Sequence, residues 1–140
     1  MIYLLLGSNL GDREGCLRAA CDALEHELGV RLRCTPPRET AAVGFEGPDF
    51  LNMAACFESP GRLTPEGLLE ICQSIERKLG RPRHEAQYNA DGTRKYVSRT
   101  IDIDILEFDE ERRCSEKLRL PHPQIDSRPF VAPLLNELKY

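Results

Sequence analysis

The 140-residue sequence contains no tryptophan, and aromatic residues make up only 6% of it. It also lacks any low-complexity tract. With 41% hydrophobic and 30% charged residues, the chain has the composition of an ordinary globular protein. We therefore exclude the collagen-like, disordered and membrane classes. The length predicts a single domain over residues 1–140, with one core and one site.

An excess of positive charge is absent as well. The 19 Lys and Arg residues stand against 23 Asp and Glu residues, which gives a net charge of -4. The molecule as a whole therefore does not attract nucleic acid or an anionic membrane. Any polyanion that it binds has to be held by a local basic cluster, so we expect no nucleic-acid partner and no membrane partner.

The N-terminus lacks the features of a signal peptide. Its short apolar run, residues 2–6, has no basic segment before it and no small-residue cleavage site after it. The run is typical of a first strand, and we expect a cytoplasmic protein.

The six cysteines include no CxxC pair. Most of them occupy apolar positions of predicted helices or strands. We therefore predict buried thiols rather than a disulfide framework.

Apolar residues recur every three or four positions in two segments, which predicts two amphipathic helices. The first begins after Asp12, whose side chain can cap it, and ends at Gly29. The second begins at Thr64, followed by a proline at the first helical position, and ends at Gly80.

Strands and loops complete the predicted order. Four strands are expected from apolar runs or from alternation with period two, at residues 2–6, 30–34, 50–57 and 100–108. A loop is expected over residues 36–49, and the tail after Leu118, which holds four prolines, is expected to carry one short helix near residues 130–138. This order indicates an α+β sandwich with helices over a mainly antiparallel sheet.

Asp102 and Asp104 give the strongest local signal for chemistry. Residues two apart in a strand point to the same face, with their Cα atoms roughly 6 to 7 Å apart, so the two carboxylates can share cations. Alternation alone does not separate a metal site from the solvated acidic face of an edge strand. The neighbouring Arg99 and the basic segment before it favour phosphates bridged by Mg²⁺.

Residues 81–98 show no periodicity and are predicted to form a long loop. Basic side chains with two interleaved tyrosines gather here and just beyond: Arg81, Arg83, His84, Tyr88, Arg94, Lys95, Tyr96 and Arg99. The set is compatible with a polyphosphate cradle, a nucleic-acid patch or a solvated loop. Only a nucleotide with Mg²⁺ uses the basic set and the paired aspartates together, which favours a nucleotide enzyme.

Two glycine patterns and one histidine are relevant to further sites. The GxxxxGK[ST] motif is absent, which excludes a Walker-type phosphate loop, and the glycine turn at residues 7–11 indicates a tight turn rather than a phosphate site. His122 lies between two prolines, where a structural and a functional role are both compatible with the sequence.

Several motifs in the same order along the chain are those of one known family. They are GSNLG at residues 7–11, PDFLN at 48–52, Glu76 followed by GRPR at 80–83, SRTIDIDI at 98–105, LPHP at 120–123 and RPF at 128–130. The sequence thereby resembles the 6-hydroxymethyl-7,8-dihydropterin pyrophosphokinases of folate biosynthesis over nearly its whole length. The most specific part is RTIDIDI followed by PHP.

The resemblance implies a ferredoxin-like fold and a reaction. That family transfers the β,γ-pyrophosphate of ATP to the hydroxymethyl oxygen of the pterin and releases AMP. By resemblance, Asp102 and Asp104 would hold two Mg²⁺ ions that bridge the triphosphate. Arg81 and Arg99 match the catalytic arginines, which would steady the transferring phosphates.

The resemblance also implies binding residues. Positions that match nucleotide contacts are Gln73, Glu76, Arg83, Tyr96, Ile105, Lys117, His122 and Arg128. Positions that match pterin contacts are Phe50 and Phe130 as stacking rings, Asn52 as the reader of the amide edge, and the backbone of Thr40, Ala42 and Val43. Without the resemblance, periodicity would favour ordinary core packing for the two phenylalanines.

The sequence departs from the family pattern at some positions. Tyr96 stands where Trp is common, Lys95 where Arg is frequent and His84 where Lys can occur. The segment 83–95 is longer than in compact members, and the tail after the last motif is short. The alternative function is therefore a nucleotide- or pterin-binding module with impaired catalysis. The sequence specifies neither the oligomeric state nor a general base.

Overall fold

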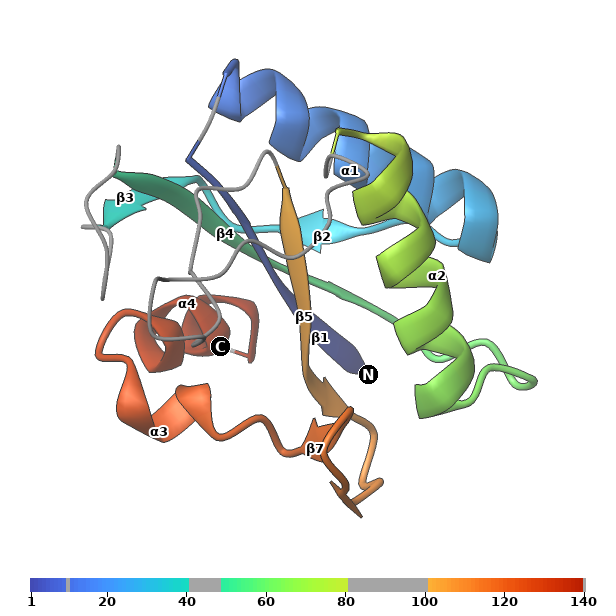
Figure 1. Ribbon diagram of the computed structural model, residues 1–140. Coiled ribbons are helices and arrows are strands. Elements are labelled where there is room, and N and C mark those ends of the chain that lie inside the picture. The colour runs from blue at the N-terminus through green and yellow to red at the C-terminus, as the bar shows by residue number, and fades with distance from the viewer. Residues whose placement is uncertain (10, 41–48, 81–100, 140) are drawn as a thin grey trace, which may run out of the picture.

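The computed structural model describes residues 1–9, 11–40, 49–80 and 101–139, and its centre is one antiparallel sheet (Figure 1). Its strands are β1 (Ile2–Ser8), β2 (Arg33–Cys34), β3 (Arg38–Thr40), β4 (Phe50–Phe57) and β5 (Asp102–Phe108). The strand order is β2-β4-β1-β5, and β3 also pairs with β4. The α+β class with a mainly antiparallel sheet is thereby confirmed.

Helices cover both faces of this sheet. One face carries α1 (Arg13–Leu28) and α2 (Pro65–Lys78), and the other carries α3 (Gln124–Ser127) and α4 (Val131–Lys139) (Figure 1). A small hairpin, β6 (Arg113–Cys114) and β7 (Arg119–Leu120), extends beyond β5. No helix in the described part of the chain is long and apolar enough to cross a membrane.

Both long helices begin where the sequence predicts; α1 also ends there, whereas α2 ends at Lys78, just before the predicted Gly80. The Asp12 side chain accepts a hydrogen bond from the Gly15 N–H at 3.1 Å, and Gly29 ends α1 with a φ of 65°. The Thr64 hydroxyl accepts one from the Gly67 N–H at 3.0 Å at the start of α2. These three boundaries are confirmed because local capping chemistry sets them.

The sheet separates two apolar cores, so the expectation of one core is wrong. Along β1, Leu4 and Leu6 face the core under α1 and α2, whereas Leu5 faces the core under α4. In β4, Met53 and Ala55 contribute to the first core, and Ala54 and Cys56 contribute to the second. Both strands are buried on two faces, which explains their almost continuous apolar sequences.

Five short elements correct the predictions. The expected loop 36–49 contains β3, and the expected strand 30–34 shortens to β2. The tail adds β7 and α3 to the one helix expected there, and β7 pairs with β6, which lies just before the tail. These pieces are two to four residues long and largely exposed, so pairing with neighbouring segments defines them and hydrophobic periodicity does not.

The cysteine prediction is wrong in part. Cys56 and Cys72 are buried, and Cys16 and Cys21 are half-buried. Cys34 and Cys114 are exposed because the short strands that carry them lie at the surface. All six thiols are free, as predicted.

Two predicted segments fall on undescribed residues. The expected loop 81–98 lies outside the described residues, as does the first position of the expected strand 100–108. From Asp102 to Phe108 that strand is present as β5.

Candidate active site

Among the residues that the structure describes, the helices cover the sheet face under α4 over only part of its length. The nine residues of α4 span about 13 Å, whereas the eight residues of β4 extend about 27 Å. The helix packs on Leu5, Ala54 and Leu106. The far end of this face, where β1 ends and β4 and β5 begin, carries polar residues instead.

A cross-strand row places three predicted site positions together. Gly7 in β1 pairs with Asn52 of β4 on one side and with Asp102 of β5 on the other. Side chains of paired residues lie on the same face, so Asn52 and Asp102 flank the bare backbone of Gly7. Asp104 pairs with Leu5 one step along the same face. Both carboxylates therefore lie on the face of α4, at the end that the described helices leave uncovered (the uncovered end).

Gly7 is needed because Asn52 occupies the space above it. A Cβ atom at Gly7 would lie 2.8 Å from Asn52 Oδ1 and 3.5 Å from Phe50 Cδ1. The first distance is shorter than real Cβ contacts allow, and Asn52 is held in place with only 4% of its surface exposed. The glycine that the sequence suggested for a tight turn thus has a packing role in the site.

The β3 and β4 strands hold the amide of Asn52. Thr40 pairs with Phe50 in register, and the Asn52 Nδ2 atom donates a hydrogen bond to Thr40 Oγ1 at 2.5 Å. The structure therefore brings Thr40, Phe50 and Asn52 together, as the resemblance implies. Ala42 and Val43 lie outside the described residues.

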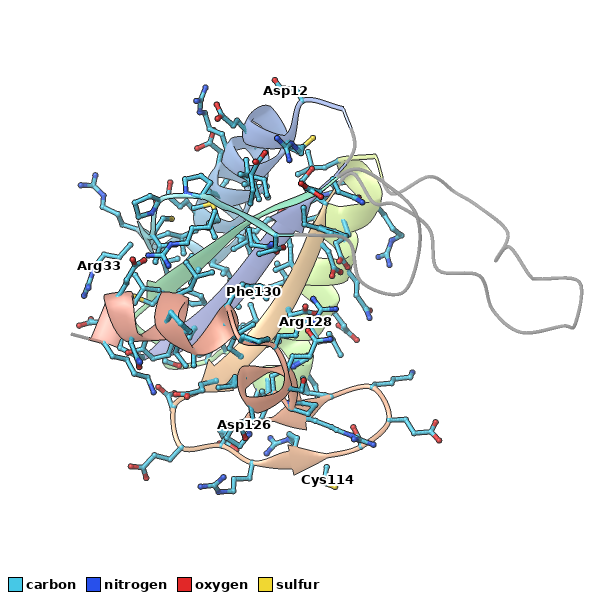
Figure 2. The ribbon with its side chains drawn as sticks, turned by 90° about the vertical axis from the view of Figure 1, so that its left-hand side faces the viewer. Asp12, Arg33, Cys114, Asp126, Arg128 and Phe130 are labelled. Atoms are coloured by element: carbon cyan, nitrogen blue, oxygen red, sulfur yellow. The ribbon has the colours of Figure 1, made fainter. Side chains whose placement is uncertain are left out.

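The segment before α4 is hydrogen-bonded to β5. The His122 N–H donates to the Leu106 carbonyl at 2.9 Å, and His122 Nδ1 accepts from the Gln124 N–H at 3.1 Å. The Arg128 guanidinium lies 5.9 Å from the centre of the Phe130 ring, and Figure 2 shows the two residues close together where the chain enters α4.

Burial and charge act on His122 together. Burial lowers its pKa, and the positive charge of Arg128 lowers it further, whereas Asp102 acts in the opposite direction. All three groups are therefore within electrostatic range of one another. The hydrogen bonds and the charges together connect the His122 segment to β5.

At the outer edge of the sheet, α2 is attached to β5 by one carboxylate. Glu76 is 4% exposed, and its Oε2 atom accepts a hydrogen bond from the Ile103 N–H at 3.0 Å. Ile103 lies between Asp102 and Asp104, so this bond fixes the backbone that carries both aspartates. Gln73 is exposed one turn earlier on α2, and Lys117 is exposed in the hairpin turn.

Sequence reasoning missed Arg13. Its Nη1 atom donates to the Asp49 carbonyl at 2.9 Å, and its Nη2 atom lies 2.6 Å from Glu39 Oε1. Arg13 thereby connects β3 to the residue that precedes β4. No local pattern signals this contact, because its partners lie 26 and 36 residues away in the sequence.

The residues present fit Mg²⁺ that is shared with phosphates. The described residues contain no group of three or more His, Cys, Asp or Glu side chains able to hold a metal by themselves. Mg²⁺ bound with substrate phosphates needs only one or two protein carboxylates. Asp102 and Asp104, half-buried on one face, offer that donor set.

Ile105 is buried in the core under α1 and α2, so the structure does not bring its side chain to the face that carries Asp102 and Asp104. Four other predicted residues are not described. Arg81, Arg83, Tyr96 and Arg99 lie outside the described residues. Their roles stay predictions, as do the binding roles of the residues described above.

Comparison with known proteins gives a consistent result. The family described as 7,8-dihydro-6-hydroxymethylpterin-pyrophosphokinase matches residues 3–140. A 2-amino-4-hydroxy-6-hydroxymethyldihydropteridine pyrophosphokinase of Porphyromonas gingivalis is 41% identical over 99% of this chain and 90% of its own length. The enzyme of that name from Bacillus subtilis is 40% identical over 97% of this chain and 76% of its own.

The similarity extends to a larger protein. A folate synthesis bifunctional protein of Chlamydia muridarum is 32% identical over 98% of this chain, which matches 30% of that protein. The resemblance expected from the motifs is thus confirmed over almost the full length. The chain belongs to the 7,8-dihydro-6-hydroxymethylpterin-pyrophosphokinase family.

Proposed function

We propose that the chain transfers the β,γ-pyrophosphate of ATP to the hydroxymethyl oxygen of 6-hydroxymethyl-7,8-dihydropterin and releases AMP, in folate biosynthesis. Family membership supports this activity. The observation that carries it is the row Asn52, Gly7, Asp102, which sets a buried amide beside an acidic pair on one face. The hydroxymethyl group of the pterin and the triphosphate of ATP then meet above Gly7.

The β4 side of the row binds the pterin. Phe50 and Phe130 stack on the flat bicycle, and Asn52 reads its amide and amino edge from a position fixed by Thr40. The backbone of Ala42 and Val43 completes this edge. Because β1 lies between β4 and β5, Asn52 and Asp102 are two strand spacings apart, roughly 10 Å. A two-ring heterocycle with a one-carbon arm spans a comparable distance.

The β5 side binds the triphosphate. Asp102 and Asp104 hold Mg²⁺, for which we propose two ions, and bound Mg²⁺ offsets the phosphate charge during transfer. Arg81 and Arg99 neutralise the transferring group and steady the phosphates while charge moves toward AMP. Nucleotide contacts come from Gln73, Glu76, Arg83, Tyr96, Ile105, Lys117, His122 and Arg128.

The residues described above orient these groups before the reaction. Glu76 holds the β5 backbone through Ile103, so the two aspartates keep a fixed spacing. Arg128 adds a positive charge beside Phe130, on the side where the nucleotide and the pterin meet. Because both substrates are positioned against one rigid sheet face, the pterin oxygen is aligned with the β-phosphorus.

Residues 1–140 form a single ferredoxin-like domain in this proposal. The order β1, α1, β2, β4, α2, β5 and the sheet order β2-β4-β1-β5 support this fold. We also propose a cytoplasmic site of action, with ATP and the pterin as partners and without nucleic acid or membrane.

The test is AMP formation by the purified chain from ATP and Mg²⁺, with and without the pterin. Pterin-dependent AMP supports the proposal, and ADP as the product contradicts it. ATP binding without nucleotide consumption favours the alternative, a binding module with impaired catalysis. The Asp22→Asn variant serves as a control, because Asp22 is exposed on α1, on the opposite face of the sheet.

A further inference from the structure

Two cysteines that the proposed reaction does not use lie side by side. The Sγ atoms of Cys21 and Cys34 are 3.9 Å apart, although the residues are 13 positions apart in the sequence. Cys21 comes from α1 and Cys34 from β2. Because β2 and β5 occupy opposite edges of the β2-β4-β1-β5 path, this pair is remote from the acidic pair of the candidate site.

The surroundings hold the two sulfur atoms within reach of each other. Glu25 Oε2 accepts a hydrogen bond from the Leu32 N–H at 2.9 Å, which fixes the connection between α1 and β2. On the far side of Cys34, the Thr35 N–H donates to the Ala54 carbonyl at 2.9 Å. A disulfide needs an S–S distance of about 2.05 Å, so the sulfur atoms have to approach while the backbone stays anchored on both sides.

The two thiols are not equivalent. Cys34 is exposed, whereas Cys21 is half-buried and packs against the core under α1 and α2. The hydrogen bond between them lowers the pKa of Cys34, and the same bond, followed by burial, raises the pKa of Cys21. Cys34 is also the thiol that a small disulfide can reach from solvent, and a thiolate is the nucleophile in thiol–disulfide exchange.

We propose that Cys21 and Cys34 form a modification site that reacts with low-molecular-weight disulfides and closes to an intramolecular disulfide. Cys34 is the attacking thiol, and Cys21 is the resolving thiol. All six cysteines lie in the described part of the chain.

The reaction balances in two steps. The Cys34 thiolate attacks one sulfur of the small disulfide, whose S–S bond breaks, and one small thiolate leaves. Cys21 then gives up its proton and attacks Cys34 Sγ in the mixed disulfide, which expels the second small thiolate. The protein loses two electrons and two protons. The small disulfide gains both and becomes two thiols.

The test is incubation of the full chain with oxidised glutathione, followed by blocking of free thiols and mass analysis of tryptic peptides. Trypsin cuts after Arg18, Arg31, Arg33 and Arg38, so the Cys21 peptide (residues 19–31) and the Cys34 peptide (residues 34–38) are separate unless linked. We expect these two peptides to be joined, with four of the six cysteines still available for blocking.

Three variants assign the roles. Cys21→Ser should stop at the mixed disulfide and carry one glutathione on Cys34, and Cys34→Ser should form no disulfide at Cys21. The matched control is Cys114→Ser, because Cys114 is exposed as well but lies on the β6–β7 hairpin, in a part of Figure 2 distant from Arg33, the neighbour of Cys34. This variant should form the Cys21–Cys34 link as readily as the wild type.

Two results would overturn the proposal. One is glutathione on Cys114 and Cys34 to equal extent in Cys21→Ser, which would mean that exposure alone governs the reaction. The other is a wild-type chain whose linked peptides do not contain Cys21 and Cys34. AMP formation by each variant, compared with the wild type, verifies that the serine substitutions leave the fold intact, since neither thiol contacts the proposed substrates.

Discussion

The two faces of the sheet are built from the same strands and differ in how far their helices reach. On one face, α1 with 16 residues and α2 with 14 residues lie over the apolar side chains of the first core. On the other face, α4 with nine residues covers the apolar side chains at only one end. The uncovered end carries Asn52, Asp102 and Asp104 instead.

This difference shows that the length of α4 decides where the site can form. A face covered along its whole length leaves no room for a ligand, so its residues serve stability. Beyond the end of the short helix, Asp102 and Asp104 are half-buried, and the buried amide of Asn52 is hydrogen-bonded to Thr40. Substitutions on the first face should therefore change folding, and substitutions on the uncovered end should change activity.

The largest effect should come from Asp102→Ala. Loss of one Mg²⁺ ligand removes several kcal/mol of stabilisation, so we expect AMP formation to fall by about a thousandfold or more. The unfolding temperature should change little, because Asp102 is only half-buried. The rate of AMP formation and a thermal melt test this, with Asp22→Asn as the control. Full activity of Asp102→Ala would contradict the assignment of the uncovered end as the site.

On the covered face, Leu24→Ala should separate stability from activity. Leu24 is fully buried in α1, so truncation should cost about 2 to 5 kcal/mol of unfolding free energy. Urea unfolding measures this, and His26→Ala, exposed on the same helix, should remain near the wild type. The KM for the pterin at a temperature where the variant is folded should stay within about twofold of wild type, the uncertainty of such constants. A much larger KM in Leu24→Ala would contradict the view that residues under α1 and α2 affect folding and not substrate binding.

Gly7→Ala should disturb both properties, because Gly7 lies under the site and within the sheet. The new Cβ atom would lie 2.8 Å from Asn52 Oδ1, so Asn52 has to move. We expect a loss of about 1 to 3 kcal/mol in stability and a roughly tenfold higher KM for the pterin. Gly61→Ala is the control, since a Cβ atom at Gly61 meets nothing within 4 Å. An unchanged KM in Gly7→Ala would argue against pterin binding by Asn52.

Arg13→Ala should have a smaller effect on the same substrate. The variant loses the bonds to the Asp49 carbonyl and to Glu39, which connect β3 to the start of β4. We expect these bonds to contribute about 1 kcal/mol to the free energy of pterin binding. Their loss should raise the KM for the pterin about fivefold and leave kcat nearly unchanged. Arg18→Ala, exposed on the same helix, serves as the control. Equal KM values for the two variants would show that Arg13 has no positioning role.

The smallest effect concerns pH. Burial and Arg128 lower the pKa of His122, so the unfolded chain binds the proton more readily than the folded chain. The contribution of neutral His122 to the free energy of unfolding should be fully present above the unfolded pKa of about 6.5. It should be lost as the pH falls through the lower pKa of the folded chain. Urea unfolding in Mg²⁺-free buffer should show this slope in the wild type and a weaker slope in His122→Gln. The same slope in both would contradict a role of His122.

The sequence alone predicted the elements that local chemistry defines. The bounds of β4 and the caps of α1 at Asp12 and of α2 at Thr64 follow from apolar runs and from capping side chains. The common face of Asp102 and Asp104 follows from the period of a strand.

The sequence did not predict contacts that depend on the tertiary fold. Short exposed strands such as β3, the bonds of Arg13 and the approach of Cys21 to Cys34 all join segments with no shared local pattern. The place of Asn52 above Gly7 depends on the register of β1 with β4. The roles of the predicted site residues rest on the family resemblance.

The most direct test of the account compares pterin binding and AMP formation in Asp102→Asn. The account places the pterin on the β4 side of Gly7 and the phosphates on the β5 side. It predicts that this variant binds the pterin with a Kd close to that of the wild type, measured by calorimetry, while AMP formation is lost. Retained AMP formation, or loss of pterin binding in the folded variant, would contradict the proposed division of the site.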